Sequence, residues 1–237
     1  MQRYFSKEKI GNSFVLDSND IYHIKTVMRM KDNDFVEIVY DKKVYLCCIE
    51  NVNSNITFNI EKEIENDMKN DKEIILAVPL LKEQKMDLIL QKSTELGVNK
   101  IIPIYLERSI IKLKHGDESK KLERWRKIVK EASEQSHRVD IPVITDIKKI
   151  SELEKIDALK VVCSTVEKEK NIKNLLISNK CCDRILVVMG PEGGLAEKEE
   201  EYLKNIGFNA VTLGSRILRV ETVPLFILSV INYEFME

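Results

Sequence analysis

Apolar positions repeat with two different periods along this chain of 237 residues, and the change falls near residue 70. Before it, apolar and polar residues alternate over short runs, which is typical of half-buried β-strands. The clearest runs are 35–40, 44–49 and 55–60. A polar stretch at 61–71 follows, which we expect to be a linker. The first 70 residues therefore predict a small β-barrel.

Two local signals refine the prediction for this first part. Residues 41–43 separate two of the predicted strands, and their length and polarity suit a tight hairpin turn. One helix is expected to interrupt the strands. Its N-cap would be Asp17 or Ser18, and it would run to about Met28.

From Glu73 onward the pattern changes to strands that alternate with helices. The predicted strands are 74–81, 101–106, 158–163, 185–189 and 208–213, and the predicted helices are 85–96, 119–137, 172–177, a charged run after residue 194, and 223–235. Such alternation implies an α/β domain with a mostly parallel sheet covered on both faces.

Two of these helices indicate what surrounds them. The helix from Ser119 carries an apolar stripe, so we expect Trp125 in the core or an interface and not stacked on a base. The helix 223–235 is apolar nearly all round, with Thr222 as the expected N-cap and Pro224 in its first turn. Such a helix must be buried on more than one side. A homodimer interface would bury it, and burial within one subunit is the alternative.

A glycine-rich pentapeptide at 190–194 follows a continuous apolar run of the kind that suits a buried strand. Its three glycines permit positive φ and let a ligand approach the backbone without a Cβ in the way. A second strand ends at a loop that opens at Gly214. Two loops at the same ends of neighbouring strands form a small-molecule site in an open α/β sheet. Their N–H and C=O groups suit the polar edge of an adenosine moiety.

Composition narrows the class of protein. Apolar content of 43% and charged content of 32% describe a soluble globular protein. No apolar run is long enough to span a bilayer, and residues 1–7 lack the apolar segment of a secretory signal, so we expect a cytoplasmic protein without a membrane partner. The five cysteines show no CxxC spacing, which favours reduced thiols over structural zinc, and no metal is expected.

Net charge is −1, but residues 82–138 hold 14 Lys/Arg against 9 Asp/Glu. This local surplus indicates either a solvated helix face or a surface that follows a phosphate backbone. The chain has no G-x-G-x-x-G after a strand, no P-loop, no serine elbow and no His-rich metal motif. Dinucleotide binding and NTP hydrolysis therefore have little support.

The pentapeptide and the later run Leu213-Gly214-x-Arg216-Ile217-Leu218-Arg219-x-Glu221-Thr222 together resemble the RsmE family of RNA methyltransferases, within the SPOUT superfamily. Further matches follow the family's order at 23–29, 91–98, 107–109 and 134–138. The resemblance implies a PUA-like RNA-binding β-barrel over 1–70 and a SPOUT methyltransferase domain with a deep trefoil knot over 71–237. It also implies methyl transfer from S-adenosylmethionine to N3 of uracil 1498 in 16S rRNA of the small ribosomal subunit.

The resemblance also implies a set of site residues. We expect the cofactor at Met189, Gly190, Pro191, Glu192, Gly193, Gly194, Leu213, Gly214, Ile217, Leu218 and Thr222. We expect Arg108 and Arg219 to stabilise a uracil anion and Glu221 to act as a base or an orienter. We expect RNA contacts at His23, Arg29, Lys82, Lys92, Arg124, Arg138 and Arg216. For each arginine, a structural salt bridge is the alternative.

Two residues depart from the family pattern. Val220 stands where the family usually has Thr, and Ala196 stands where it usually has an N-capping Ser. Ala196→Ser is therefore expected to raise the melting temperature without changing activity. Two other functions stay open at this point: a non-catalytic RNA-binding factor in ribosome assembly, and a SPOUT enzyme for another RNA position.

Overall fold

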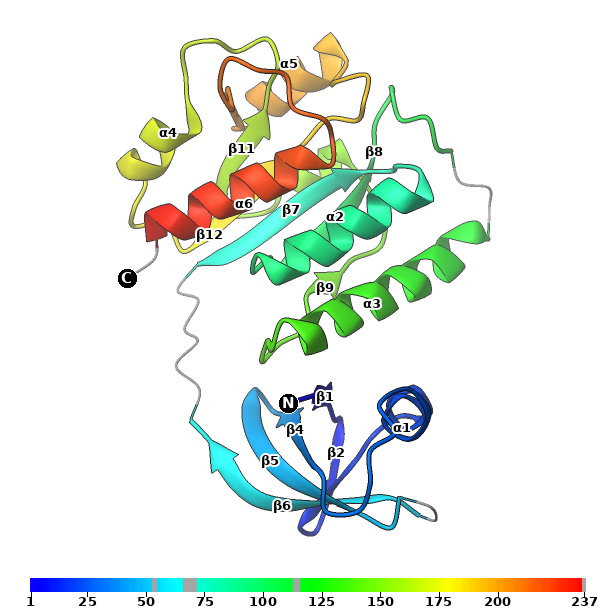
Figure 1. The fold of residues 1–237 in the computed structure, drawn as a ribbon. Coiled ribbons are helices and arrows are strands. Elements are labelled where there is room, and N and C mark those ends of the chain that lie inside the picture. The colour runs from blue at the N-terminus through cyan, green and yellow to red at the C-terminus, as the bar shows by residue number, and fades with distance from the viewer. Residues whose placement is uncertain (53–54, 66–71, 113–115, 236–237) are drawn as a thin grey trace. The chain divides into compact units, whose positions relative to one another are not determined.

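The structure is a computed structural model, and it describes residues 1–52, 55–65, 72–112 and 116–235. The chain divides into two compact units, shown in Figure 1. The first comprises residues 1–69 and 133–140, and the second comprises residues 70–132 and 141–237. The predicted boundary between residues 70 and 71 lies outside the described residues.

A six-stranded sheet forms the first unit. Its strands are β1 (Arg3–Phe5), β2 (Glu8–Ile10), β3 (Ser13–Val15), β4 (Phe35–Tyr40), β5 (Lys43–Glu50) and β6 (Thr57–Ile64). Their order is β1-β4-β5-β6-β3-β2, and all neighbours are antiparallel except the parallel pair of β1 and β4. Strand β6 pairs with β5 as far as Ile64, so the prediction of a linker was wrong for residues 61–64. Backbone pairing holds that polar end of the strand even though its side chains are largely exposed.

The two local signals in this unit are confirmed. Asp41 and Lys42 both have positive φ, at 49° and 62°, as the two-residue turn between β4 and β5 requires. Helix α1 (Ser18–Tyr22) begins at Asp17, whose carboxylate accepts the backbone N–H groups of residues 19 and 20 at 3.0 and 2.9 Å. A π-helix (His23–Val27) continues it to the predicted end at Met28.

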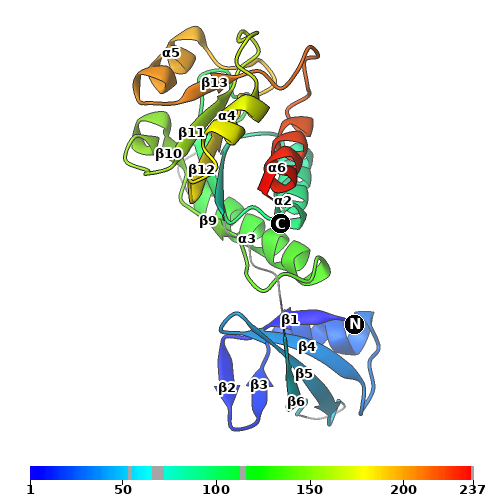
Figure 2. The same ribbon diagram turned by 90° about the vertical axis from the view of Figure 1, so that its left-hand side faces the viewer.

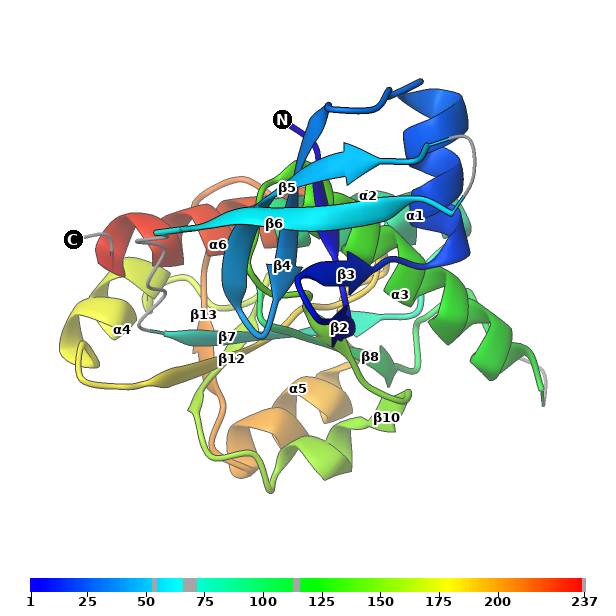
Figure 3. The ribbon, with the colours of Figure 1, turned by 90° about the horizontal axis from the view of Figure 1, so that it is seen from below.

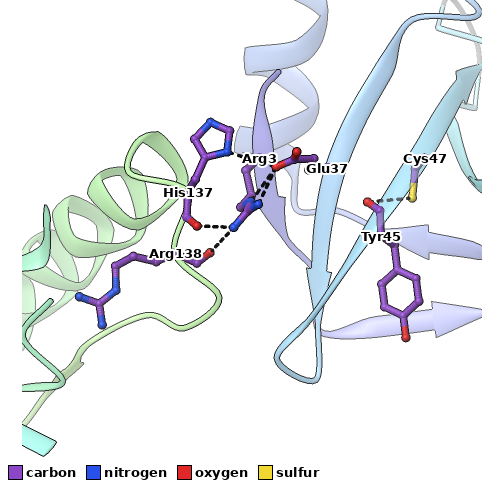
Figure 4. A network of polar contacts seen from close by, with 6 residues as sticks. All are labelled: Arg3, Glu37, Tyr45, Cys47, His137 and Arg138. Atoms are coloured by element: carbon purple, nitrogen blue, oxygen red, sulfur yellow. Dashed lines mark hydrogen bonds and ion pairs between the residues drawn. The ribbon is translucent and has the colours of Figure 1, made fainter. Parts of the chain in front are cut away.

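The residues that follow helix α3 (Asp117–Gln135) are tied to this first sheet. Arg3 is only 7% exposed, and it pairs with Glu37 at 2.8 Å. Its guanidinium also donates to the backbone carbonyls of His137 and Arg138, as Figure 4 shows. A buried arginine that satisfies two carbonyls and a carboxylate explains why 133–140 belongs to the first unit.

A seven-stranded sheet forms the second unit. Its strands are β7 (Glu73–Pro79), β8 (Lys100–Tyr105), β9 (Val143–Ile144), β10 (Lys148–Lys149), β11 (Leu159–Cys163), β12 (Arg184–Val188) and β13 (Asn209–Val211). Their order is β10-β8-β7-β12-β11-β13 with β9 paired to β8, and every pair is parallel. The prediction of a parallel sheet is therefore confirmed.

Helices cover both faces of this second sheet, as Figures 2 and 3 show. One apolar cluster packs α2 (Glu83–Glu95), α3, α4 (Ile172–Ser178) and α6 (Thr222–Phe235) against one face. A second cluster packs α5 (Glu197–Asn205) and a 3-10 helix (Ile150–Leu153) against the other. Trp125 is 3% exposed within the first cluster, which confirms its place in the core.

Helix α6 begins at Thr222, one residue earlier than predicted, so Thr222 lies in the first turn and is not the N-cap. The cause is a tight turn in which the backbone N–H groups of Thr222 and Val223 both donate to the carbonyl of Arg219, at 2.9 and 3.2 Å. The helix packs against α2 and α4, yet Phe226 and Tyr233 remain 37% and 81% exposed. Packing within one chain therefore does not bury all of its apolar surface.

None of the helices among the described residues has the length and apolar content that crossing a membrane demands. The five cysteines are free thiols. The trefoil knot implied by the resemblance remains a prediction.

Candidate active site

A cavity of about 370 Å³ is built mainly from loops that follow β11 and β12 and from the segment before α6. These strands are parallel neighbours, so their following loops leave from the same edge of the sheet. The cavity is lined by residues expected at the site: Gly190, Pro191, Glu192, Gly194, Ile217, Leu218 and Arg219. A smaller cavity of about 60 Å³ shares some of this wall and adds Leu213, Gly214 and Arg216. The structure thus brings together the two segments that the sequence singled out, the pentapeptide 190–194 and the run 213–222 that contains Gly214. We refer to both as glycine-rich segments.

Three expected cofactor residues lie elsewhere. Met189 is fully buried in the core at the end of β12. Gly193 is exposed beside Arg108, and Thr222 is exposed in the first turn of α6. None of the three lines either cavity within the described part of the chain.

The first glycine loop folds back so tightly that only hydrogen fits at one position. A Cβ placed on Gly190 would lie 2.9 Å from the backbone N of Leu195 and 3.2 Å from the carbonyl carbon of Gly194. Gly194 itself has φ +70°, in the left-handed region that glycine adopts without strain. These two glycines therefore let the loop close on itself, and both of them line the larger cavity.

Arg108 holds the same loop from outside. Its Nη1 donates to the carbonyls of Gly193 and Leu195, both at 3.0 Å. The residue lies just after β8 and remains exposed. Its contacts show a brace on the loop, and its expected role toward the uracil anion stays a prediction.

An ammonium group joins the two glycine-rich segments. Lys85, in the first turns of α2, places its Nζ 3.0 Å from Glu192 Oε1 and 3.3 Å from Glu221 Oε2. Glu192 belongs to the first segment and Glu221 to the second. The two carboxylates, chiefly that of Glu192, raise the pKa of Lys85. Lys85 is therefore charged at neutral pH, and it holds both segments at the cavity.

Glu221 is an ionised carboxylate in this setting. A hydrogen bond from its own backbone N–H lowers its pKa most, and Lys85 and Arg219 lower it further. Oε2 of Glu221 is buried and lies at ion-pair distance from Lys85, but no hydrogen bond of good geometry reaches it from the described residues. A carboxylate with a depressed pKa is a weak proton acceptor, so the electrostatics favour orientation over general-base action.

A second carboxylate lies in the wall on the side of α5. Glu200 is 6% exposed, and its Oε1 accepts a hydrogen bond from Ser164 Oγ at 2.9 Å. Lys204 Nζ lies 2.9 Å from the same oxygen. Ser164 follows β11, so this contact anchors α5 to the end of that strand.

The residues expected to contact RNA fall into two groups. Three of them are paired within the chain: Lys92 with Glu95 at 2.8 Å, Arg138 with Asp140 at 2.9 Å, and Arg124 with Asp87 at 2.5 Å. The others include Arg29, Lys82 and Arg216, which are exposed and form no ion pair with described residues, and His23, whose Nδ1 lies 3.0 Å from Tyr4 Oη. Only Arg216 lines one of the two cavities.

Sequence reasoning missed several residues of the wall. Lys85, Cys163, Thr165 and Glu200 line the larger cavity and were not among the candidates. Cys163 and Thr165 lie at or just after the end of β11. The sheet order could have indicated these two residues. Strand β11 lies between β12 and β13, so its end lies at the same edge of the sheet as the two glycine-rich segments. Lys85 and Glu200 had no such signal, since a charged residue early in a helix is usually solvated.

The parallel sheet with two loops at one edge, together with the two domain profiles that match the chain, defines the class of protein as an RNA methyltransferase of the SPOUT type that carries a PUA domain. The sequence profile of an RNA methyltransferase domain matches residues 68–232, and that of an RNA methyltransferase PUA domain matches residues 16–61. The chain belongs to the ribosomal RNA small subunit methyltransferase E, or RsmE, family.

Full-length relatives support this assignment. Ribosomal RNA small subunit methyltransferase E of Bacillus subtilis (strain 168) is 34% identical over 99% of this chain and 97% of its own length. That of Mesomycoplasma hyopneumoniae (strain 232) is 37% identical over 97% of this chain and 98% of its own. The crystal structure of the Neisseria gonorrhoeae enzyme bound to S-adenosyl methionine is 30% identical, covers 99% of this chain and 98% of its own, and has a TM-score of 0.89.

Proposed function

We propose that this protein transfers a methyl group from S-adenosylmethionine to N3 of uracil 1498 in 16S rRNA of the small ribosomal subunit. The observation that carries the proposal is the cavity between the two glycine-rich segments, with Lys85, Glu221 and Arg219 at its edge. Its volume of about 370 Å³ is in the range of small-molecule sites, about 300–1,000 Å³.

The protein's own task is to position the uracil and stabilise its anion, because the bound cofactor supplies an electrophilic methyl group. Uracil N3 lies on the Watson–Crick edge and carries a proton, so the base must be unpaired to react. Arg219 and Arg108 stabilise negative charge at O2 or O4. The carboxylate of Glu221 forms an ion pair with Lys85 and attracts Arg219. These interactions keep the two cationic groups in place. The N3 proton passes to water.

RNA binding is assigned to cationic residues of both units. Arg29, Lys82 and Arg216 are the strongest candidates, because they are exposed and carry no competing carboxylate among the described residues. The side chains of Lys92, Arg124 and Arg138 would have to exchange a carboxylate of this chain for a phosphate of the RNA. That exchange lowers the expected gain in RNA-binding free energy.

A homodimer through α6 forms part of the proposal. Phe226, Ser229 and Tyr233 are exposed along one face of the helix, and Leu225 and Val230 beside them are half-buried. Sedimentation of the wild-type protein is expected to give a dimer, and Tyr233→Glu is expected to shift it toward monomer. A wild-type monomer at micromolar concentration would overturn this part.

The substrate is tested by mass spectrometry of 16S rRNA from cells that lack the gene. The expected result is loss of 3-methyluridine at that position and its return when the wild-type gene is supplied. Unchanged 3-methyluridine would remove the substrate claim. Absence of S-adenosylmethionine binding in calorimetry would instead indicate a non-catalytic RNA-binding protein.

A further inference from the structure

Glu200 is a buried acidic side chain that the proposed reaction does not use. It is 6% exposed, and it lines the larger cavity. Its contacts with Ser164 and Lys204 both use Oε1. No described residue donates a hydrogen bond to Oε2. Oε2 is not among the fully buried oxygens that lack a partner, and Glu200 lines the cavity, so this oxygen stays open to accept a hydrogen bond from a ligand there.

The charge around Glu200 indicates what kind of donor fits. Lys204 already provides a cation 2.9 Å from the carboxylate. The Glu200–Lys204 ion pair is neutral overall, so it offers little attraction to a second cation such as the α-ammonium of the methionine part of the cofactor. A neutral donor such as a hydroxyl satisfies Oε2 without adding charge. Carboxylates bind vicinal ribose hydroxyls in other nucleotide sites for the same reason.

The position of Glu200 indicates which part of a nucleoside it meets. Its anchor, Ser164, follows β11, which lies between β12 and β13 in the sheet. The two glycine-rich segments follow those two flanking strands. A base whose polar edge contacts the backbone of both segments therefore leaves its sugar over the end of β11, beside Cys163 and Thr165.

We propose that Glu200 is a specificity residue for the methyl donor, accepting a hydrogen bond from its ribose hydroxyls through Oε2. The inference rests on the proposed cofactor, and it names a contact on this chain beyond the glycine loops. Ser164 and Lys204 are positioning residues, because they fix Oε1 and so orient the free oxygen.

The test is calorimetry with S-adenosylhomocysteine, its 2′,3′-dideoxy analogue and 5′-methylthioadenosine, which keeps the ribose but lacks the amino-acid part. Wild type is compared with Glu200→Gln and with the control Glu201→Gln, an exposed neighbour on the same helix. Glu200→Gln is expected to weaken S-adenosylhomocysteine and 5′-methylthioadenosine by the same factor, roughly tenfold or more. The dideoxy analogue should bind wild type at least roughly tenfold more weakly than S-adenosylhomocysteine, and Glu200→Gln should add little to that loss.

Three results would overturn the inference alone. The first is unchanged affinity for S-adenosylhomocysteine in a folded Glu200→Gln protein. The second is a loss of affinity for S-adenosylhomocysteine but not for 5′-methylthioadenosine, which would assign Glu200 to the α-ammonium. The third is equal binding of S-adenosylhomocysteine and its dideoxy analogue by wild type. The last needs no variant, so it can refute the inference even if Glu200→Gln does not fold. A wild-type protein that binds none of the three ligands would overturn the proposed function as well.

Discussion

Replacing Gly190 with alanine tests the geometry of the first glycine loop. The new methyl carbon would lie 2.9 Å from Leu195 N, 3.2 Å from Gly194 C and 3.3 Å from Leu195 Cγ. Two of these atoms are backbone, so the clash cannot be relieved by turning one side chain. Movement of the Gly194–Leu195 segment would also weaken the bond from Arg108 to the Leu195 carbonyl.

The expected cost follows from these contacts. Overpacking a fitted site costs about 1–3 kcal/mol, and in a chain of this size each kcal/mol lowers the melting temperature by about 2–4 °C. Gly193→Ala is the matched control three residues away, because its Cβ would meet nothing closer than Arg108 Cβ at 3.5 Å, an ordinary contact. Thermal denaturation and calorimetric titration with S-adenosylmethionine measure both variants.

Gly190→Ala is expected to lose stability and at least roughly tenfold in cofactor affinity, since a shift of a few tenths of an ångström misplaces a cavity wall. Gly193→Ala is expected to keep wild-type stability. If the two variants behave alike, the close packing of this loop does not govern the site, and the reasoning from its backbone fails.

Three further predictions concern charge and capping. Lys85→Met leaves two carboxylates without their shared cation. Since folding depresses the pKa of Glu221, the stability of the ion pair is present above about pH 4.3, its unfolded value, and is lost as pH falls through the folded pKa. The melting-temperature gap between wild type and Lys85→Met should therefore be wide at pH 7 and shrink at pH 3, whereas a constant gap would point to packing. Glu221→Gln should slow methylation without moving the pH–rate profile, whereas loss of an acidic limb that the wild-type profile shows would identify Glu221 as a general base. Ala196→Ser should raise the melting temperature by about 2–4 °C, since an N-cap is worth about 1 kcal/mol. Ala196 occupies the N-cap position of α5, and Glu199 already accepts a hydrogen bond from its backbone N–H at 3.0 Å. An unchanged melting temperature would show that the serine makes no cap.

The sequence pattern predicted most of the regular structure because the signals involved are local. Continuous apolar runs gave the parallel strands, and spacing of three and four gave the helix stripe around Trp125. The cap at Asp17 and the turn at Asp41–Lys42 were also predicted, since each depends on one or two side chains or dihedral angles.

Features that depend on distant partners were not predicted. Residues 133–140 join the first unit through Arg3, which is more than 130 positions earlier in the chain. Strand β6 continues to Ile64 because β5 supplies its hydrogen bonds, although its own side chains there are polar. Lys85 and Glu200 gain their significance only from the carboxylates and hydroxyl that the fold brings to them.

The most direct test of the central claim is a crystal structure of the protein with S-adenosylhomocysteine bound. The prediction is an adenosine moiety in the cavity between residues 190–194 and 213–218, with its base on their backbone groups and its ribose beside Glu200. Ligand density in another crevice, or an empty cavity at saturating ligand, would contradict the account.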